Sequence, residues 1–591
     1  MRYLTPILAT AAIILSTKPA YSYLGEQAIK LLPGEGSAVA VSDQAIDSEP
    51  SDSIQPHEKT SNHYLPGWGF SSPAALPSFG SAISVQVNID IDNENILNDA
   101  ANEPSIAVDP TAPNRMAIGW RQFDTVKDGF RQAGWGYSND GGRSWTFPGV
   151  LEPGVFRSDP VLDFDAEGNF YYYSVSLIRS QITSQMFKSV NGGVTWGESV
   201  LAWGGDKHWM VIDRTGGIGH GNIYASWTFS SVCGGQRFTR SYDGGQTFLP
   251  CIQLPDNAQW GTLAVGPAGE LYLSGNQFVI IKSSTIQDEN LPAQFDFATP
   301  VNMGGIVQNF LKGSPNPGGL LGQPWVVVNH AAGPAQGDVY MLCSVEPEPS
   351  GGDPMDVHFV RSTDGGKNWS SPIRVNDDPV DNGAWQWFGT MSIAPNGRLD
   401  VIWNDTRHNT GQSNLSELFY SSSTDGGVTW STNTQLSTVF DSWIGWPQHD
   451  KIGDYYDMVS DDVGANLAWA ATFNGEQDVY YLRIGDYDCN SNGIPDSDDL
   501  DSGESSDCNN NDIPDECEIA AGAVKDDNQD GIPDQCADCP WDLDNSGSVD
   551  TGDLLELFAQ WGTAGSADFD GSGAVGTSDL LILFANWGPC E

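Results

Sequence analysis

The chain has 591 residues, of which 77 are acidic and 26 are Lys or Arg, so its formal net charge at pH 7 is −51. This charge repels nucleic acid and anionic membrane surfaces, which excludes the nucleic-acid-binding classes of protein. The length predicts several domains, and abundant Gly, Trp and Pro between short apolar runs predict mainly β structure.

Residues 1–22 have the features of a secretory signal peptide, with an early Arg, an apolar run over residues 4–15 and a small-x-small motif at residues 20–22. That run is too short to cross a bilayer and no later run is apolar enough, so we expect an exported protein without membrane insertion of the mature chain. An uncleaved N-terminal anchor is the alternative. Residues 23–80 are rich in Ser, Pro, Gly and acidic residues without periodicity, which predicts a disordered linker.

Eight residues recur almost unchanged five times in the next part of the chain. The copies are SNDGGRSW (138–145), SVNGGVTW (189–196), SYDGGQTF (241–248), STDGGKNW (362–369) and STDGGVTW (423–430). The paired glycines give the backbone freedom of a tight turn, the Asp caps the turn's amides, and the aromatic residue fills the space between sheets. The pattern resembles the Asp-box, or BNR repeat, of sialidase-like β-propellers. The resemblance implies that residues 81–485 form such a propeller and that the octapeptides are structural turns.

A second repeat counts the blades more completely than the octapeptide. A short apolar strand, a turn and a second apolar strand recur seven times, at spacings of roughly 50–70 residues. Each unit supplies the two inner strands of a blade, and the octapeptide lies in the turn between the two outer strands. We therefore predict seven blades, with six, the number usual in true sialidases, as the alternative. The strand SAISVQVNIDI (81–91) is expected to complete the last blade and leave no exposed sheet edge.

Polar and aromatic residues stand just before each first strand and just after each second strand, and these positions converge on one mouth of a propeller. Carboxylates and amides suit sugar hydroxyls and Trp faces suit sugar rings, so the mouth is the predicted carbohydrate site. The candidate catalytic residues are Glu103, Asp159, Asp206, Asp454 and Tyr455. The candidate substrate-binding residues are Arg121, Lys207, His208, Trp209, Trp260, Gln323, Trp387, Asp405 and Arg407.

The mouth departs from the sialidase pattern at its first motif. The resemblance implies three Arg that grip a carboxylate, a Tyr with a nearby Glu as nucleophile, and an Asp as acid/base. The first family Arg lies in an Arg-Ile-Pro motif, whereas residues 102–105 here read Asn-Glu-Pro-Ser. Another glycosidase activity stays open, because Asp159 with Asp206, or Glu103 with Asp454, would supply a carboxylate pair if they face each other.

After residue 485 the composition changes, and Asp becomes the dominant residue. Three loops over residues 486–538 place oxygen ligands at positions 1, 3, 5 and 9, the spacing with which a tight loop surrounds Ca²⁺. Their candidate ligands are Asp488, Asn490, Asn492, Asp496 and Asp499, then Asp507, Asn509, Asn511, Asp515 and Glu518, then Asp526, Asn528, Asp530 and Asp534. These loops resemble thrombospondin type 3 repeats, which implies a calcium-loaded stalk stapled by disulfides.

The last segment, residues 539–591, joins a calcium-type loop to an apolar helix twice. The candidate ligands are Asp542, Asp544, Ser546, Asp550 and Asp553 in the first loop, and Asp568, Asp570, Ser572 and Asp579 in the second. The duplication resembles a type I dockerin, which implies a cohesin-like partner. A self-contained calcium-stabilised end cap is the alternative, and in both cases folding should need calcium because few apolar residues are available for a core.

Because the chain has a predicted export signal, we expect its cysteines to form disulfides. Cys233 and Cys251 flank the third octapeptide and are expected to pair. In the tail, equal spacing suggests bridges 489–508 and 517–536, with Cys539 and Cys590 closing the last module. Cys343 is predicted to be a buried thiol.

Three functions remain open for an exported, calcium-dependent propeller. The first is a glycoside hydrolase acting on an extracellular glycan or glycoprotein. The second is a non-catalytic glycan- or protein-binding propeller. The third is a structural component of the cell envelope.

Overall fold

A computed structural model describes residues 71–591, except 257, 349–352, 446–450, 510, 527–530, 534–535, 537–538, 540, 545, 547 and 590–591. The chain divides into the unit Met1–Ser42 and the unit Asp43–Glu591, and all of the structure described here belongs to the second. The predicted signal peptide, and the predicted linker as far as residue 70, lie outside the described residues.

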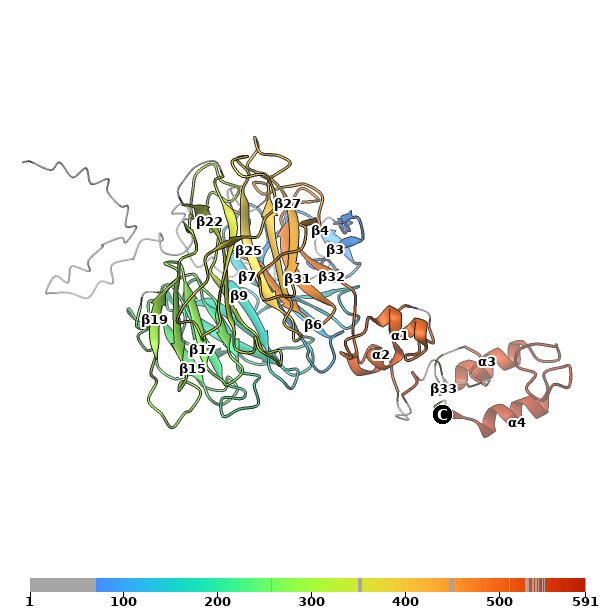
Figure 1. Ribbon diagram of the computed structural model, residues 1–591. Helices are drawn as coiled ribbons and strands as arrows, with labels where there is room; N and C mark the ends of the chain where they lie inside the picture. Colours follow the sequence, from blue (N-terminus) through green and yellow to red (C-terminus); the bar gives the residue numbers. More distant parts are fainter. Residues whose placement is uncertain are drawn as a thin grey trace, which may run out of the picture. The chain divides into compact units, whose positions relative to one another are not determined.

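Seven antiparallel sheets form the blades of a propeller (Figure 1). Blades 1 to 3 are β5 (Ala100–Val108), β6 (Met116–Phe123), β7 (Arg131–Ser138) and β8 (Thr146–Leu151); β9 (Arg157–Phe164), β10 (Phe170–Ile178), β11 (Gln181–Ser189) and β12 (Val200–Leu201); and β13 (Trp209–Ile212), β14 (Ile223–Ser226) and β15 (Phe238–Ser241). Blade 4 is β16 (Leu263–Val265), β17 (Leu271–Gly275), β18 (Val279–Ser283) and β19 (Phe297–Pro300). Blade 5 is β21 (Trp325–Val328), β22 (Val339–Pro347), β23 (Asp356–Ser362) and β24 (Ile373–Arg374), with β20 (Gly305–Ile306) added to β22. Blade 6 is β25 (Gln386–Ile393), β26 (Leu399–Asp405), β27 (Leu415–Ser423) and β28 (Thr434–Gln435), with β29 (Phe440–Asp441) added to β27.

Blade 7 is built from both ends of the propeller sequence. It contains β30 (Asp457–Ser460), β31 (Gly464–Ala471) and β32 (Asp478–Gly485), followed by β3 (Ala82–Gln86) and β2 (Ser78–Phe79). Strand β3 pairs with β32, where Val85 lies opposite Tyr481. The prediction that the segment 81–91 completes the last blade is confirmed.

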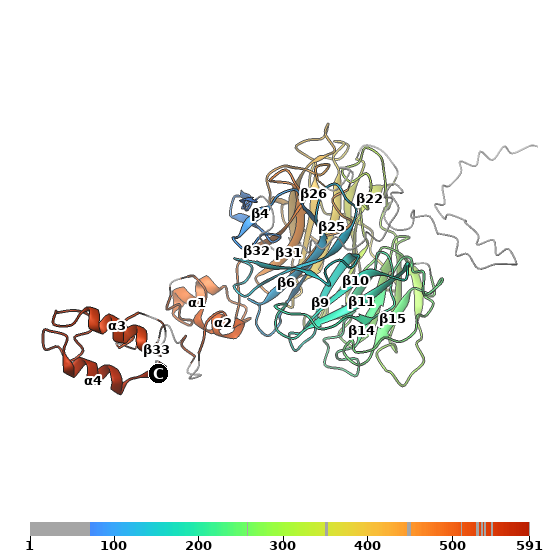
Figure 2. The same ribbon diagram turned by 180° about the vertical axis from the view of Figure 1, so that it is seen from behind.

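The innermost strands close a ring of seven. Each of β5, β9, β13, β16, β21 and β25 contacts the inner strand of the following blade, and β30 contacts β5. Figure 2 shows the blades from behind, with β9 and β25 of this ring labelled. The seven-bladed prediction is confirmed, and six blades are excluded.

Strands are present before the predicted boundary at residue 81. Strand β1 (Ser71–Pro73) pairs with β4 (Glu94–Ile96), and β2 pairs with β3, so residues 71–79 carry ladder hydrogen bonds. The end of the predicted linker is therefore structured, because it covers the outer edge of blade 7.

The octapeptides form five turns with one shared hydrogen-bond pattern. In every copy the second Gly amide donates to the Ser hydroxyl at 2.9 Å. In the first copy Gly142 has a φ of 82°, and a Cβ added there would lie 2.2 Å from the Tyr481 ring of blade 7, so only glycine fits. The Trp145 and Tyr481 ring centroids are 5.4 Å apart, which joins blade 1 to blade 7. The turns therefore connect blades as scaffold.

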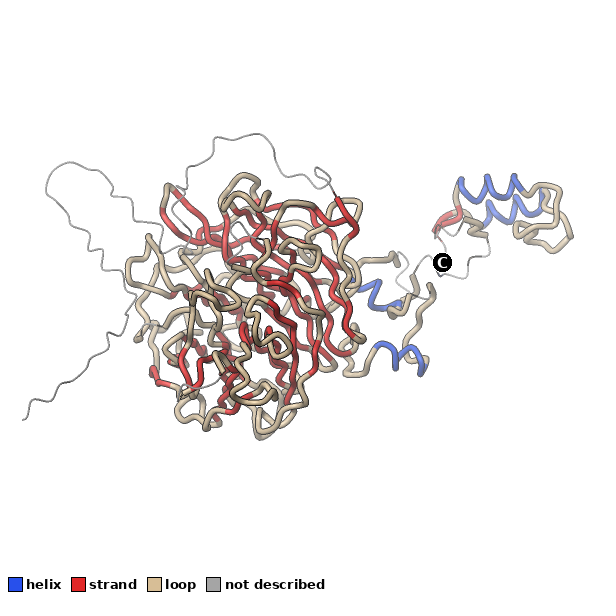
Figure 3. Tube along the Cα trace, turned by 90° about the horizontal axis from the view of Figure 1, so that it is seen from above, coloured by secondary structure: helices blue, strands red, loops and turns tan. Residues whose placement is uncertain are grey.

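Among the described residues, the helices lie in the C-terminal part of the chain (Figure 3). They are α1 (Asp496–Ser502), α2 (Asp515–Ala521), α3 (Thr551–Ala559) and α4 (Thr577–Ala585), and a short pairing of β33 (Ser548–Val549) with β34 (Gly588–Pro589) accompanies the last two. Their small core contains Val549, Leu557, Ala567, Val575 and Leu583. Within the described ranges, none of the helices combines the length and the apolar character needed to cross a bilayer.

Candidate functional site

The axis of the propeller is filled by aromatic side chains. Trp209 of blade 3 lies 5.1 Å from Trp325 of blade 5 and 5.3 Å from Tyr455, which precedes the first strand of blade 7, measured between ring centroids. Blades 3, 5 and 7 are not neighbours, so these contacts are made across the axis. The axis is packed rather than open, and a ligand at this mouth must bind over the plug formed by these rings.

In five blades, a non-glycine residue at the entrance to the innermost strand has a left-handed backbone conformation. Glu103, Asp159, Lys207, Trp260 and Phe388 have φ values of 51°, 50°, 50°, 55° and 59°. The strand register shifts next to three of them, which marks a β-bulge in blades 1, 2 and 6. Left-handed non-glycine residues cost about 1–3 kcal/mol each and concentrate at functional sites, where bulges redirect side chains.

Five charged side chains meet above the aromatic plug, and we call this group the axial cluster: Glu103, Arg121, Lys207, Lys451 and Asp454. Arg121 Nε lies 3.1 Å from Glu103 Oε2, and Lys451 Nζ lies 3.7 Å from Glu103 Oε1 and 2.8 Å from Asp454 Oδ2. Lys207 Nζ lies 3.6 Å from Asp454 Oδ2 and 4.2 Å from the centre of the Tyr455 ring. All five side chains are buried.

In the axial cluster, Glu103 and Asp454 both lie next to the Lys451 ammonium group. The sequence suggested these two residues as a carboxylate pair, and the structure brings them together. Lys451, which joins them, was not among the residues proposed from the sequence. Its position three residues before Asp454 was the available signal, but the turn that folds it back on Asp454 is a tertiary feature.

Burial changes the protonation of this group. It raises the pKa of Glu103 to about 8, although Arg121, Lys207 and Lys451 act in the opposite direction. Burial and the neighbouring Glu103 raise the pKa of Tyr455 well above its usual value. The Tyr455 hydroxyl donates to the Pro160 carbonyl at 2.7 Å, so the phenol is held in place as a neutral donor.

The other two acidic candidates, Asp159 and Asp206, take part in hydrogen bonds with backbone groups. Asp159 accepts hydrogen bonds from the Lys207 amide at 2.8 Å and the Ser158 hydroxyl at 2.6 Å. Asp206 forms an isolated antiparallel bridge with Phe229. The structure therefore gives the Asp159 side chain a role in fixing the mouth, whereas Asp206 forms its bridge through its own backbone.

Several predicted sugar-binding side chains are inside the protein. Trp387 is fully buried, and its indole donates to Ser416 Oγ at 3.1 Å, so its face is not available for stacking. Trp209 belongs to the plug, and Gln323 is buried. Burial lowers the pKa of His208 to about 4, so this residue is a neutral imidazole. These residues are corrected to core positions, because strand entrances in a closed ring face its packed axis.

Asp405 and Arg407 form an ion pair rather than a free sugar grip. Arg407 Nη2 lies 2.9 Å from Asp405 Oδ2, and Arg407 Nη1 lies 2.8 Å from Asp377 Oδ1. The guanidinium group is therefore already matched by two carboxylates.

Trp260 and Phe310 are accessible aromatic residues on the mouth side. Trp260, at the entrance of blade 4, is half-buried, and Phe310, in the connection from blade 4 to blade 5, is 44% exposed. Their ring centroids are 6.2 Å apart, and both residues have left-handed backbone, with φ of 55° and 54°. The Trp260 amide donates to Thr228 Oγ1 at 3.2 Å, which fixes the strained turn. Trp260 was predicted from the sequence, whereas Phe310 lies in a long connection that gave no signal.

The tail disulfides differ from the predicted pairs. The bridges are Cys489–Cys517 and Cys508–Cys536, each with a Cα–Cα distance of 5.8 Å, while Cys233–Cys251 is as predicted and Cys343 is a buried free thiol. Equal spacing holds for the predicted pairing of these four cysteines and for the observed one, so spacing did not distinguish the two. Cys539 is disulfide-bonded, and Cys590 lies outside the described residues. Disulfides are typical of compartments other than the cytoplasm.

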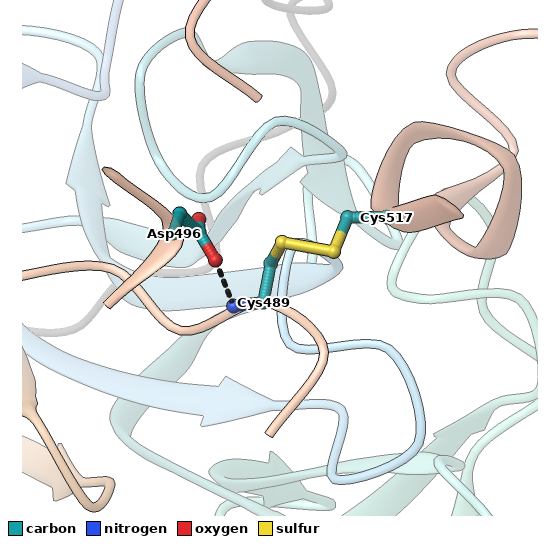
Figure 4. Close-up of side chains that lie close together, drawn as sticks. All are labelled: Cys489, Asp496 and Cys517. Atoms are coloured by element: carbon teal, nitrogen blue, oxygen red, sulfur yellow. Dashed lines mark hydrogen bonds between the residues drawn. A yellow bond between two sulfur atoms is a disulfide. The ribbon is translucent and has the colours of Figure 1, made fainter. Parts of the chain in front are cut away.

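Cys489, Asp496 and Cys517 lie together, but they do not form a metal centre (Figure 4). Both sulfurs belong to the disulfide, and Asp496 Oδ1 accepts a hydrogen bond from the Cys489 amide at 2.8 Å. In the next loop, Asp515 Oδ1 likewise accepts a hydrogen bond from the Cys508 amide at 3.0 Å.

The first two tail loops converge on one buried carboxylate each. Asn490 and Asn492 donate to Asp499 Oδ2 at 3.1 and 2.8 Å, and Asn511 donates to Glu518 Oε1 at 2.8 Å in the second loop. Asp499 Oδ1 is buried without a hydrogen-bond partner. Rotated amides would present oxygen toward the same point, so these residues fit an oxygen-coordinated cation. In the third loop only Asp526 is described, and Asn528, Asp530 and Asp534 lie outside the described residues.

The last two loops each bring three acidic side chains together. Carboxylate oxygens of Asp542, Asp544 and Asp553 lie within 4.8 Å of one another, as do those of Asp568, Asp570 and Asp579. The Ser546 amide donates to Asp542 and the Ser572 amide donates to Asp568, which closes both loops in the same way. Asp550 instead caps α3 by accepting from the Gly552 amide.

No protein-family profile and no curated protein sequence matches the chain. Solved structures with a similar fold include a protein of unknown function from Dyadobacter fermentans, at 12% identity and a TM-score of 0.38, covering 66% of this chain and 98% of that one. A leech intramolecular trans-sialidase has 11% identity and a TM-score of 0.33, with 58% and 68% covered. An α-L-arabinofuranosidase from Fusarium graminearum has 10% identity and a TM-score of 0.34, with 70% and 98% covered. We draw no functional conclusion from similarities this low.

Proposed function

We propose that the protein is an exported carbohydrate-binding propeller whose ligand lies against Trp260 and Phe310. The carrying observation is this pair of accessible aromatic rings, held by left-handed backbone at the mouth. Aromatic faces stack on sugar rings, and the plugged axis directs a ligand to the rim, where these rings lie.

Glycan-array screening of the full chain, with and without EDTA, tests the proposal. Binding of a glycan class by the wild type and by Phe79→Ala, together with its loss in Trp260→Ala, supports it. Phe79 is a matched control because it is an exposed aromatic residue on the outer strand β2. Equal binding by all three proteins, or no binding by any of them, argues against it.

A glycoside hydrolase is the second candidate, and one observation favours it. A carboxyl group whose pKa is about 8 is protonated at neutral pH, as a general acid must be, and Glu103 lies beside Tyr455. Against this, Glu103 has no exposed surface and is surrounded by the cations of the axial cluster. Turnover of chromogenic glycosides by the wild type, abolished in Glu103→Gln, would favour the hydrolase over the binding protein.

We propose Ca²⁺ as the cation of the tail loops. The carboxylate triads of residues 542–553 and 568–579, and the buried Asp499 and Glu518, support it through their oxygen-only chemistry. Asp542, Asp544 and Asp553 would hold one ion, and Asp568, Asp570 and Asp579 another.

We propose that residues 539–591 dock a cohesin-like protein through a duplicated apolar face. Leu555, Phe558 and Trp561 on the first repeat are 69%, 49% and 43% exposed, and Leu581, Phe584 and Trp587 on the second are 64%, 49% and 43% exposed. The rings pair within each repeat at 5.7 and 5.5 Å. Exposed aromatic pairs are typical of protein-binding surfaces. In a pull-down, we expect a cohesin domain to bind the wild type and not the double variant Phe558→Ala/Phe584→Ala. A folded module that binds no cohesin domain would instead support the self-contained end cap.

A further inference from the structure

Phe310 is carried by the long connection between blades 4 and 5, and we call residues 309–321 of this connection the strap. The two arms of the strap pair with each other. Asn309 forms an isolated antiparallel bridge with Leu320. The Phe310 amide donates to the Gly319 carbonyl at 2.9 Å. The place of Phe310 therefore depends on where the second arm of the strap is held.

That second arm is fastened to the segment that leads into blade 7. Asn316 is fully buried, and its Nδ2 donates to the Leu320 carbonyl at 2.7 Å and to the Gly453 carbonyl at 2.8 Å. Its Oδ1 accepts a hydrogen bond from the Ile452 amide at 2.9 Å. One side chain thus closes the strap on itself and ties it to two backbone groups before blade 7.

The axial cluster supplies a second anchor. The Leu320 amide donates to Asp454 Oδ1 at 2.6 Å, while Oδ2 of the same carboxylate lies 2.8 Å from Lys451 Nζ. A Cβ added to Gly319 would lie 2.4 Å from Asn316 Nδ2 and 2.7 Å from Asp454 Oδ1, so the strap fits tightly against both anchors. Hydrogen bonds to a buried charged group are stronger than those between neutral groups, so this anchor resists displacement.

We propose that Asn316 is a positioning residue for the carbohydrate site, which anchors the strap so that Phe310 stays beside Trp260. The inference deepens the proposed function and rests on it. Phe310 is 44% exposed, and its left-handed backbone persists only where the surrounding chain fixes it. A ring held in advance binds a sugar without the entropic cost of ordering its loop. The axial cluster would then act on the site through Asp454, which holds the strap.

Fluorine NMR of the full chain labelled with 5-fluorotryptophan tests the anchoring without any glycan. The Trp260 resonance is assigned by its absence from Trp260→Phe. Asn316→Ala should shift this resonance in the same direction as Phe310→Leu does, because both take the Phe310 ring away from Trp260. Asn302→Ala is the matched control, since Asn302 is an exposed asparagine of the same connection, and it should leave the resonance in place. An unmoved Trp260 resonance in Asn316→Ala would overturn the inference.

Affinity for a glycan from the array shows whether the anchoring serves binding. Asn316→Ala should weaken binding at least about tenfold, as we expect for Phe310→Ala. The double variant Asn316→Ala/Phe310→Ala should bind no more weakly than Phe310→Ala, because two changes that act through one ring are not additive. Full additivity would overturn the inference and leave the proposed function intact. Absence of glycan binding by every protein would refute the proposed function, and the NMR result would still decide the anchoring.

Hydrogen exchange of the wild type covers the case in which Asn316→Ala fails to fold. Peptides from the strap should exchange far more slowly than the exposed turn at residues 214–218, because the Phe310 and Leu320 amides are hydrogen-bonded within an anchored segment. Equal exchange rates in the two segments would contradict a fixed strap.

Discussion

The Lys451 ammonium lies 2.8 Å from Asp454 Oδ2, and both side chains are almost completely buried. The same ammonium lies 3.7 Å from Glu103 of blade 1, so one lysine contacts the carboxyl groups of two different blades. The axial cluster is therefore an internal ion-pair network that holds the mouth, with the aromatic plug beneath it.

Removing this lysine should destabilise the propeller strongly. We expect Lys451→Met to lower the free energy of unfolding by about 3–5 kcal/mol, because the buried Asp454 carboxylate loses the ammonium group 2.8 Å away. Thermal unfolding followed by circular dichroism measures the effect. Lys127→Met removes an exposed lysine and is the control, which should unfold like the wild type.

The raised pKa of Glu103 predicts a pH dependence of stability. Its folded pKa of about 8 exceeds the ordinary value of 4.5, so the folded state holds an extra proton between these values. The free energy of unfolding should therefore fall as pH rises through this window, by at most about 1.4 kcal/mol per pH unit, and level off above pH 8.

Glu103→Gln separates this contribution from that of Asp457, whose pKa is raised to about 7. We expect the loss of stability between pH 7 and 8 to shrink in Glu103→Gln and to persist in Asp457→Asn. Identical pH profiles for Glu103→Gln and the wild type would rule out a neutral Glu103.

Calcium removal should unfold the C-terminal module. Its core has few buried apolar residues, so the proposed metal ions would supply much of its folding free energy. We expect EDTA to abolish the protease resistance of residues 539–591, and Asp553→Asn to do so even with calcium present. Glu556→Gln is the control, because Glu556 is exposed on the same helix; a calcium-independent digestion pattern would contradict the metal assignment.

Replacing the Asp of an octapeptide turn by Ala should destabilise the protein, whereas replacing it by Asn should have much less effect. Asp425 accepts hydrogen bonds from the Val428 and Thr429 amides, each at 2.9 Å. In the second copy Asn191 accepts from the Thr195 amide at 3.0 Å, so an amide serves the same purpose. We expect Asp425→Ala to cost about 1 kcal/mol and Asp425→Asn much less, measured by chemical unfolding, without an effect on glycan binding. A greater loss in the Asn variant would show that the charge is essential.

The sequence was sufficient for the blades because their signals are local. Apolar strand pairs and the octapeptides repeat with the fold, and residues 81–91 complete the last blade as the missing strand predicted. The mouth was predictable only as a region. Trp387 and Trp260 both stand at strand entrances, yet the ring buries the first and leaves the second half-exposed, since that outcome depends on contacts between blades distant in the sequence. The same limit explains Lys451 and the tail disulfides.

Affinity for a glycan identified on the array tests the central proposal most directly. Isothermal titration of the full chain should show binding by the wild type and by Phe79→Ala, weakened at least tenfold in both Trp260→Ala and Phe310→Ala, with melting temperatures unchanged. That loss corresponds to about 1.4 kcal/mol, within the range for removing one stacked ring. Wild-type affinity in both variants would contradict a carbohydrate site at Trp260 and Phe310.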